Sequence, residues 1–364
     1  MKKSQLITEL QSHGLRLTNG TVGAEGRRGG AGPSDHKAVT IEGTTVMVPI
    51  YTDTATQSPY SAEVASDQHQ ATLTRATTAI ADIEFPLQPK FYGLQTADGI
   101  PYWKIALLHS RNVLATTVQQ TCMRYVDEAT ACQFCAIGKS LEQGRTIARK
   151  TPEQLAEVAE AAVRLDGVSN MIMTTGTPGT ADRGAAHLAD CARAVKARVN
   201  LPIQAQCEPP ADFAWFERMR QAGIDSLGMH LEAVDPAVRA RIMPGKAEVP
   251  VEVYFEAFAA AVKVFGWGQV STYLLAGLGD SAETLIATSA RLIDLGVYPF
   301  VVPFVPISET PLAGHPAPSP QLMNTVYQQV GDLLQRGGIT SASMKAGCAK
   351  CGACSALSAF ERDA

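Results

Sequence analysis

The sequence predicts an α/β protein built around a partial (β/α)6 barrel, with an N-terminal α+β extension and a C-terminal cysteine-rich tail. From residue 112 onward, short runs of β-branched residues alternate with amphipathic helical patterns, which is typical of a parallel sheet wound by helices. About six such units follow within about 200 residues, fewer than the eight of a closed barrel. We therefore expect an open barrel.

Composition limits the classes of protein that need to be considered. The chain has 364 residues, a formal net charge of −4 and 46% hydrophobic residues, so it can bury a substantial core. A near-balanced charge argues against a nucleic-acid partner, and no apolar run reaches the roughly 20 residues of a membrane span. The cysteines cluster in sequence instead of spreading as a disulfide framework, which favours the reducing cytoplasm. We expect domains at residues 1–111, 112–320 and 321–364.

The N-terminal extension is expected to contain short elements joined by turns. Its patterns predict a helix at 5–13, a hairpin of strands 38–41 and 44–50, a helix at 68–83, and a second hairpin of strands 91–94 and 102–107. Between the first two elements lies a glycine-rich loop, 23–33, that includes Arg27 and Arg28. Its backbone amides and arginines suit an anionic group, and an ordinary surface loop is equally consistent with the pattern.

The barrel elements follow in order. Thr151, Pro152 and Gln154 form a capping-box pattern that starts one of the helices. The predicted strands are 112–118, 169–175, 202–207, 226–230, 270–275 and 300–305. The predicted helices are 151–165, 184–198, 212–221, 236–242, 251–264, 282–295 and 321–336.

Three cysteines after the first barrel strand indicate a metal site. Cys122, Cys132 and Cys135 have the spacing C-x9-C-x2-C, with Phe134 directly before the last. Three thiolates can hold three irons of a four-iron cluster and leave the fourth iron open to a ligand. A structural zinc site normally needs four protein ligands, so this set is one short. Unrelated core cysteines are the other alternative.

This run resembles the cluster loop of radical S-adenosylmethionine (SAM) enzymes, whose usual spacing is C-x3-C-x-Φ-C. Cys132, Phe134 and Cys135 match the second half, whereas the first gap is longer, so the ligand role of Cys122 has weaker support. The resemblance implies an oxygen-sensitive [4Fe–4S] cluster and SAM, with Phe134 packed beside both. It also implies reductive cleavage of SAM to a 5′-deoxyadenosyl radical that abstracts hydrogen from a small molecule. A one-electron donor such as flavodoxin or ferredoxin would supply the electron.

The resemblance continues over about residues 112–312 and includes motifs like those of biotin synthase. In such folds the chemistry lies at the carboxyl ends of the strands, and this chain has glycine, carboxylate and basic residues there. Each also has an ordinary explanation, such as a turn glycine or a hydrogen-bonded core histidine. The SAM-binding residues that the resemblance implies are Thr175, Gly176, Thr177, Gln206, Glu208, His230, Glu232, Arg239, Arg241 and Gly277.

The C-terminal tail carries a second cysteine group. Cys348, Cys351 and Cys354 have the spacing C-x2-C-x2-C, which matches the first three ligands of a bacterial ferredoxin run. The pattern favours an auxiliary iron–sulfur cluster, while a zinc knuckle and a metal-free tail stay open. The fourth ligand would be Ser358, which occupies the fourth ferredoxin position, a distant cysteine (Cys191 or Cys207), or a substrate.

Several functions are compatible with two such sites. The auxiliary cluster could donate sulfur, bind substrate or relay an electron. Loop 23–33, the cysteine spacing and the tail also resemble a radical SAM group encoded beside nitrilases and acetyltransferases, which implies a small nitrogen-containing metabolite as substrate. The alternatives are a two-cluster electron-transfer protein, which needs no SAM-binding residues, and a zinc-dependent barrel hydrolase.

Overall fold

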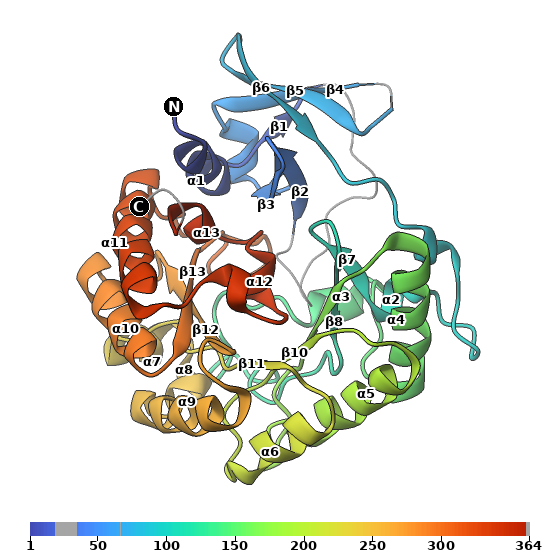
Figure 1. Cartoon of the computed structure of the whole chain (residues 1–364). Coiled ribbons are helices and arrows are strands. Elements are labelled where there is room, and N and C mark those ends of the chain that lie inside the picture. Colours follow the sequence, from blue (N-terminus) through green and yellow to red (C-terminus); the bar gives the residue numbers. More distant parts are fainter. Residues whose placement is uncertain (19–34, 66, 362–364) are drawn as a thin grey trace.

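The structure, a computed structural model, describes residues 1–18, 35–65 and 67–361. The predicted anion-binding loop, 23–33, lies outside these residues. Two sheets dominate the part that is described (Figure 1): an N-terminal sheet and a larger sheet curled into a partial barrel.

The barrel sheet confirms the predicted fold class. Its strand order is β13-β12-β11-β10-β9-β8-β7, and β8 to β13 run parallel in sequence order. Strand β7 (Leu107–His109) pairs antiparallel with β8 at one edge. The parallel strands are β8 (Val113–Thr117), β9 (Asn170–Thr174), β10 (Ile203–Gln206), β11 (Ser226–Gly228), β12 (Val270–Ala276) and β13 (Val297–Pro303).

The barrel is open between β7 and β13, which are the two ends of the strand order. Pro299 lies inside β13, and proline is tolerated there because an edge strand has one side without a pairing partner. This last strand begins earlier than predicted, at Val297, and residues 304 and 305 already belong to the loop that follows.

Helices cover the outer face of the curled sheet (Figure 1). The capping box at Thr151 is present, with Pro152 at the first helical position. All the predicted barrel helices are found: α4 (Pro152–Asp166), α5 (Ala185–Arg198), α6 (Ala214–Gln221), α7 (Pro236–Ile242), α9 (Val251–Phe265), α10 (Ala282–Asp294) and α11 (Pro320–Gly337). Shorter helices are α2 (Tyr102–Ile105), α3 (Lys139–Glu142), α8 (Pro244–Ala247), α12 (Cys348–Cys351) and α13 (Leu357–Phe360).

The N-terminal sheet packs on α1 (Lys3–His13) and has the order β1-β4-β5-β6-β2-β3. Its strands are β1 (Arg16–Leu17), β2 (His36–Ile41), β3 (Thr44–Pro49), β4 (Tyr60–Val64), β5 (Gln70–Arg75) and β6 (Thr78–Glu84). Three short 3-10 helices complete the elements: η1 (Thr54–Gln57), η2 (Lys90–Gly93) and η3 (Ser341–Ser343).

Two predictions in this region are wrong. Residues 68–83 form the antiparallel pair β5–β6 instead of a helix, because Ala71 and Leu73 alternate with more exposed threonines, as on a half-buried strand. Residues 91–94 and 102–107 do not form a hairpin. They are mostly η2 and α2, and only one bridge, between Gln95 and Pro101, spans the turn.

The tail enters the barrel from the amino ends of the strands. The carbonyl of Ala346 accepts from the hydroxyl of Ser226 (2.9 Å), and the amide of Gly347 donates to Asn170 (3.4 Å). Ser226 and Asn170 are the first residues of β11 and β9. The N-terminal sheet covers the tail, since the amide of Met47 donates to the carbonyl of Ala353 (2.7 Å). Because the three parts share such contacts, the division at residues 111 and 320 remains our proposal.

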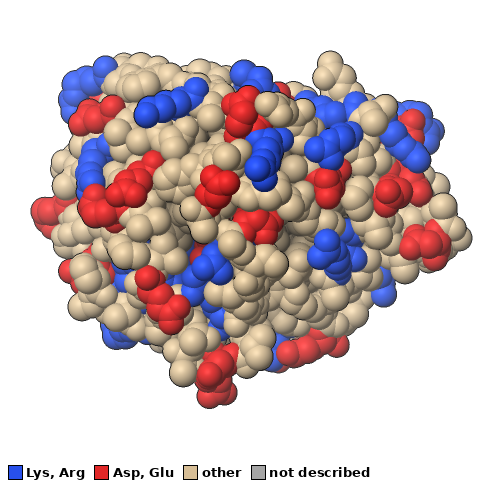
Figure 2. All heavy atoms as spheres, turned by 90° about the horizontal axis from the view of Figure 1, so that it is seen from below, with Lys and Arg blue, Asp and Glu red and all other residues tan. Residues whose placement is uncertain are grey.

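The surface gives little sign of a large charged partner on the face shown in Figure 2, where acidic and basic side chains are interspersed. Across the described residues, no helix combines the length and the apolar character needed to traverse a bilayer.

We predict that Gly347→Ala undocks the tail. Gly347 has φ +108°, a conformation nearly restricted to glycine, and an added Cβ would lie 2.1 Å from the side-chain amide carbon of Gln204. That amide cannot easily move, because it is fully buried and hydrogen-bonded to Ser271 and to the amide of Cys348. Strain and overpacking together should cost about 2–6 kcal/mol in urea unfolding. The side chain of Lys345 is already exposed, and a loosened tail should be cleaved after it by trypsin much faster.

The matched control is Gly338→Ala. Gly338 also has a positive φ (+65°), but no atom lies within 4 Å of an added Cβ. Its cost should be only about 1–2 kcal/mol, with trypsin resistance of the tail unchanged. Equal costs for the two variants would show that the Gln204 contact does not hold the tail.

Candidate functional site

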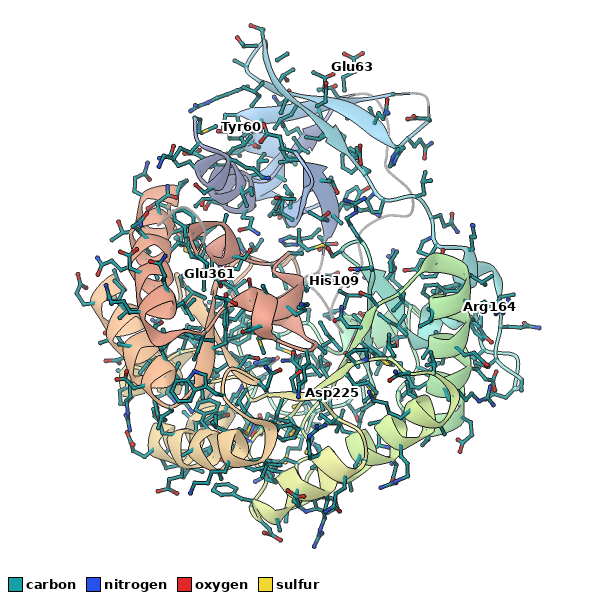
Figure 3. All side chains as sticks on the ribbon, viewed as in Figure 1. Tyr60, Glu63, His109, Arg164, Asp225 and Glu361 are labelled. Atoms are coloured by element: carbon teal, nitrogen blue, oxygen red, sulfur yellow. The ribbon has the colours of Figure 1, made fainter. Side chains whose placement is uncertain are left out.

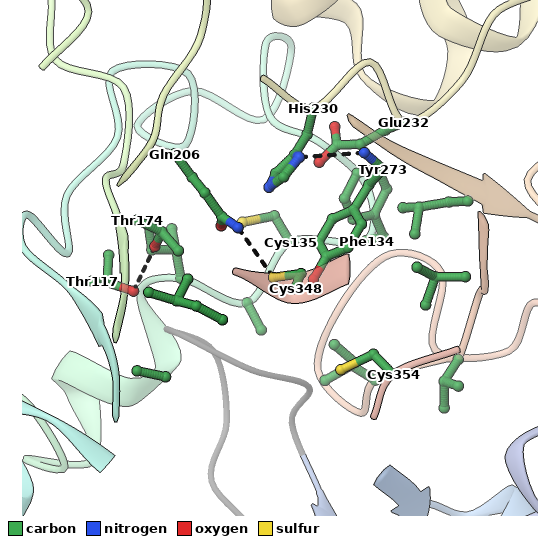
Figure 4. Close-up of a pocket in the computed structure, with 18 of the residues that line it drawn as sticks. Thr117, Phe134, Cys135, Thr174, Gln206, His230, Glu232, Tyr273, Cys348 and Cys354 are labelled. Atoms are coloured by element: carbon green, nitrogen blue, oxygen red, sulfur yellow. Dashed lines mark hydrogen bonds between the residues drawn. The ribbon is translucent and has the colours of Figure 1, made fainter. Parts of the chain in front are cut away.

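A cavity of about 420 Å³ lies inside the curled sheet (Figure 4). This size is typical of small-molecule sites. Phe134 and Cys135, from the loop after β8, line it together with residues at the carboxyl ends of the strands. Cys348 and Cys354 of the tail line it as well. One cysteine of the first group, Cys135, and two of the second, Cys348 and Cys354, therefore face one cavity.

The first cysteine loop is tied to the barrel by backbone hydrogen bonds. The amide of Met123 donates to the carbonyl of Thr177, and the amide of Gln133 donates to the carbonyl of Ile242, both at 2.8 Å. These contacts anchor the loop near both ends of its long first gap. The nine residues between Cys122 and Cys132 are therefore held to the barrel at both ends, although this gap is longer than in the usual motif.

The thiols of Cys122, Cys132 and Cys135 lie close enough to influence one another. Burial, and to a smaller extent the neighbouring Cys122, raise the pKa of Cys135 to about 12, while burial also raises the pKa of Cys132. Three thiolates here would repel one another without a cation, and metal binding favours their deprotonation. The donor set therefore fits an iron–sulfur cluster.

No three His, Cys, Asp or Glu side chains within the described ranges converge on one metal-ion position. The thiolates of a four-iron cluster bind separate irons, so they surround a larger body than a single ion.

Glu208 is held in a buried ion pair. The guanidinium of Arg124 donates to both its carboxylate oxygens (2.9 and 2.8 Å), and the hydroxyl of Thr177 donates to one of them (2.9 Å). Arg124 also donates to the carbonyl of Gly245. Thr177 and Glu208, both predicted SAM contacts, are thus linked to the cysteine loop through a residue two positions after Cys122.

A second buried ion pair joins Glu232 to Lys246, with 2.8 Å between Nζ and the carboxylate. Burial opposes the charge on Lys246, but Glu232 outweighs it and raises the pKa of the lysine. Glu232 itself has φ +67°, which is unusual for a residue with a side chain. Such strain is often retained at functional sites, and both side chains line the cavity.

His230, Tyr273 and Gln206 line the cavity around Cys135 and Cys348 (Figure 4). The His230 ring stacks on Tyr273, with ring centroids 4.2 Å apart, and its Nδ1 accepts from the Tyr273 amide (3.3 Å). Burial lowers the pKa of His230 to about 3, so the ring is neutral and its Nε2–H is left to donate. This Nε2 is buried and has no partner, which suits a cavity ligand. Gln206 donates to the thiol of Cys348 (3.1 Å).

Three predicted SAM contacts are not on the cavity wall. Arg239 is buried and donates to four backbone carbonyls, those of Leu231, Ala233, Lys246 and Val249. Both terminal nitrogens of its guanidinium are engaged by the loops around α7, so its position does not fit the predicted SAM contact. Arg241 donates to the carbonyl of Leu278 (3.1 Å). Gly277 has φ +104°, and an added Cβ would lie against Pro318. The backbone conformation and the packing therefore explain why this position is a glycine.

The structure brings the other predicted residues together on the cavity wall: Phe134, Cys135, Thr175, Gly176, Thr177, Gln206, Glu208, His230, Glu232, Cys348 and Cys354. Cys122 and Cys132 belong to the same loop as Cys135, and Cys351 lies in the same tail as Cys348. Sequence reasoning missed Arg124, Lys246 and Tyr273. Arg124 could have been predicted as a site residue, because it lies only two positions after the predicted ligand Cys122.

Comparison with known families agrees with this geometry. The sequence model of the Radical SAM superfamily matches residues 121–292, from the first cysteine loop to α10. This chain carries a radical SAM domain. The match supports the predicted class of enzyme. Members of this superfamily use a [4Fe–4S] cluster, SAM, a reductant and a small-molecule substrate.

Individual relatives share only part of the chain. The chain is 33% identical over 135 residues to a bacteriochlorophyllide c C-7(1)-hydroxylase of Chlorobaculum limnaeum. The match covers 36% of this chain and 33% of that one. The chain thus spans about a third of the length of this curated relative. Solved structures with a similar fold include methylornithine synthase PylB (TM-score 0.48, 19% identity, 63% of both chains). Another is the hydrogenase maturase HydG of Carboxydothermus hydrogenoformans (TM-score 0.45, 15% identity, 62% of this chain and 51% of that one).

We predict that Gly176→Ala displaces the first cysteine loop. An added Cβ would lie 2.3 Å from the carbonyl oxygen of Thr121, the residue before Cys122. Backbone must then move, so iron bound by this loop after anaerobic reconstitution should fall several-fold. In Gly179→Ala the nearest atom, the sulfur of Met123, is 3.9 Å away, so this control should keep its iron. Full iron content in both variants would contradict the proposed packing.

We also predict a pH-dependent cost for Arg124→Gln. Burial favours the neutral form of Glu208, but Arg124 and Lys246 outweigh it and hold its pKa below the ordinary value. The stability gained from this carboxylate is present at neutral pH and is lost as the pH falls through the lowered pKa. Without Arg124 the pKa rises, so the destabilisation should be about 3–5 kcal/mol near pH 8 and smaller near pH 4.

Urea unfolding of the metal-free protein at several pH values measures this cost. The control Arg193→Gln breaks an ion pair whose members are 64% and 61% exposed, and should cost under about 1 kcal/mol. A cost for Arg124→Gln that does not change with pH would count against the ionised pair.

Proposed function

We propose that Cys122, Cys132 and Cys135 hold a [4Fe–4S] cluster and that the cavity binds SAM and a small nitrogen-containing metabolite. One observation carries this proposal: the cysteine loop lies at the carboxyl end of the parallel sheet, on a cavity whose wall gathers the strand-end residues. When bound, the cluster and SAM would supply a 5′-deoxyadenosyl radical for hydrogen abstraction from the substrate.

The residues of the wall have separate tasks in this proposal. Phe134 covers one side of the cysteine loop and limits access of solvent. Glu232 and Lys246 place a negative and a positive charge side by side on the wall, which suits the amino and carboxylate groups of an amino acid. The Nε2–H of His230 is positioned to donate to a ligand between the two cysteine groups.

We further propose that Cys348, Cys351 and Cys354 hold an auxiliary iron–sulfur cluster beside the same cavity. Support comes from their proximity: Cys348 and Cys351 begin and end one short helix, α12, and Cys348 and Cys354 line the same cavity. Burial, and to a smaller extent the neighbouring Cys348, raise the pKa of Cys351 to about 12. Flavodoxin or ferredoxin is the proposed electron donor. The identification of the substrate as a nitrogen-containing metabolite rests on the resemblance in sequence.

The two assignments make a combined prediction. Anaerobically reconstituted protein should contain about eight irons per chain, and about four after either cysteine group is changed to alanine. With SAM and dithionite, the wild type and the tail variant should both form 5′-deoxyadenosine, since cleavage of SAM needs only the first site. The Cys122→Ala/Cys132→Ala/Cys135→Ala variant should form none.

Other outcomes would identify a different protein. Iron in both sites without any 5′-deoxyadenosine would point to an electron carrier. Zinc without iron or sulfide would point to a zinc hydrolase.

A further inference from the structure

The tail cysteines contact the barrel at two distinct places. Cys348 accepts from Gln206 (3.1 Å) and also contacts the hydroxyl of Tyr273. The other two cysteines contact the turn between β7 and β8. The hydroxyl of Ser110 hydrogen-bonds to the thiol of Cys351, and the Nε2 atom of His109 lies 3.5 Å from the sulfur of Cys354.

His109 is the last residue of β7 and lies 245 positions before Cys354 in the sequence, so only the fold brings the two side chains together. Figure 3 places it between the N-terminal sheet and the barrel, beside the tail. It lines the same cavity as Cys348 and Cys354. A ring nitrogen beside a candidate thiolate ligand is well placed to bind a metal that the thiolate also binds.

We propose that His109 is the fourth protein ligand of the tail centre, which gives a four-iron cluster held by three cysteines and one histidine. This inference rests on the proposed tail cluster and adds the residue that completes it. Imidazole is an established ligand of iron, and histidine replaces cysteine in some iron–sulfur centres. With four protein ligands the tail cluster has no open iron, so substrate would not bind to it directly.

The alternatives from the sequence are less favourably placed. Cys191 lies on α5, buried, with its sulfur 3.8 Å from a ring nitrogen of His187. Ser358 borders a separate hollow that it shares with Cys351 and Ser110. Cys207, directly after β10, lines the cavity. None of these three residues has a described contact with Cys354, whereas His109 contacts it directly.

A neutral histidine ligand would also change the reduction potential of the tail cluster. Replacing a thiolate by an imidazole removes one negative charge from the cluster environment and raises its reduction potential. His109→Cys should therefore keep the cluster and lower its midpoint potential. His109→Ala should leave one iron open.

The test uses the full chain with Cys122, Cys132 and Cys135 all changed to alanine, so that only the tail can hold a cluster. Protein labelled with ¹⁵N at histidine alone is reconstituted anaerobically with iron and sulfide, reduced, and examined by pulsed electron paramagnetic resonance. We expect about four irons per chain and a ¹⁵N hyperfine coupling from one histidine. In His109→Cys the coupling should disappear while the iron content stays the same.

The controls are His36→Gln, which changes another histidine on the cavity wall, and Ser358→Ala. Both should retain the ¹⁵N coupling. Iron without histidine coupling, or coupling that survives in His109→Cys, would overturn the role of His109 but leave the tail cluster in place. Absence of iron from the parent variant would overturn both the tail cluster and its ligand.

Discussion

The close packing of Gly347 against the buried amide of Gln204 is the contact on which the cavity depends. It lets the tail pack into the barrel at the amino ends of β9, β10 and β11. From there, Cys348 reaches the wall formed by Gln206 and Tyr273. The tail therefore fills a space that a closed barrel would pack with its own side chains. The cavity that remains lies between two cysteine groups.

Two ion pairs with little solvent exposure lie beside the cavity. Arg124–Glu208 and Lys246–Glu232 place charge in a region of low polarity, where an unpaired partner would be costly. Well-packed apolar residues often stabilise a fold as well as such pairs do. Their retention beside a cysteine loop is consistent with a role in binding charged ligands, and Arg124 also fixes the loop relative to β10.

Much of this arrangement could be predicted from the sequence because it depends on local patterns. The six parallel strands, the long helices and the glycine beside the cysteine loop all follow from periodicity, caps and turn residues. The helix predicted at 68–83 failed because a run of threonines and alanines fits either period, and pairing with β4 and β2 decided between them. Arg124, Lys246 and His109 were missed because their partners are remote in sequence: 84 residues separate Arg124 from Glu208.

The central claim is that one cavity lies between two iron-binding cysteine groups. Anomalous diffraction at the iron edge, from crystals grown anaerobically after reconstitution, tests it most directly. The account predicts two separate iron peaks, one beside Cys122, Cys132 and Cys135 and the other beside Cys348, Cys351 and Cys354. A single peak, or peaks away from these cysteines, would contradict it.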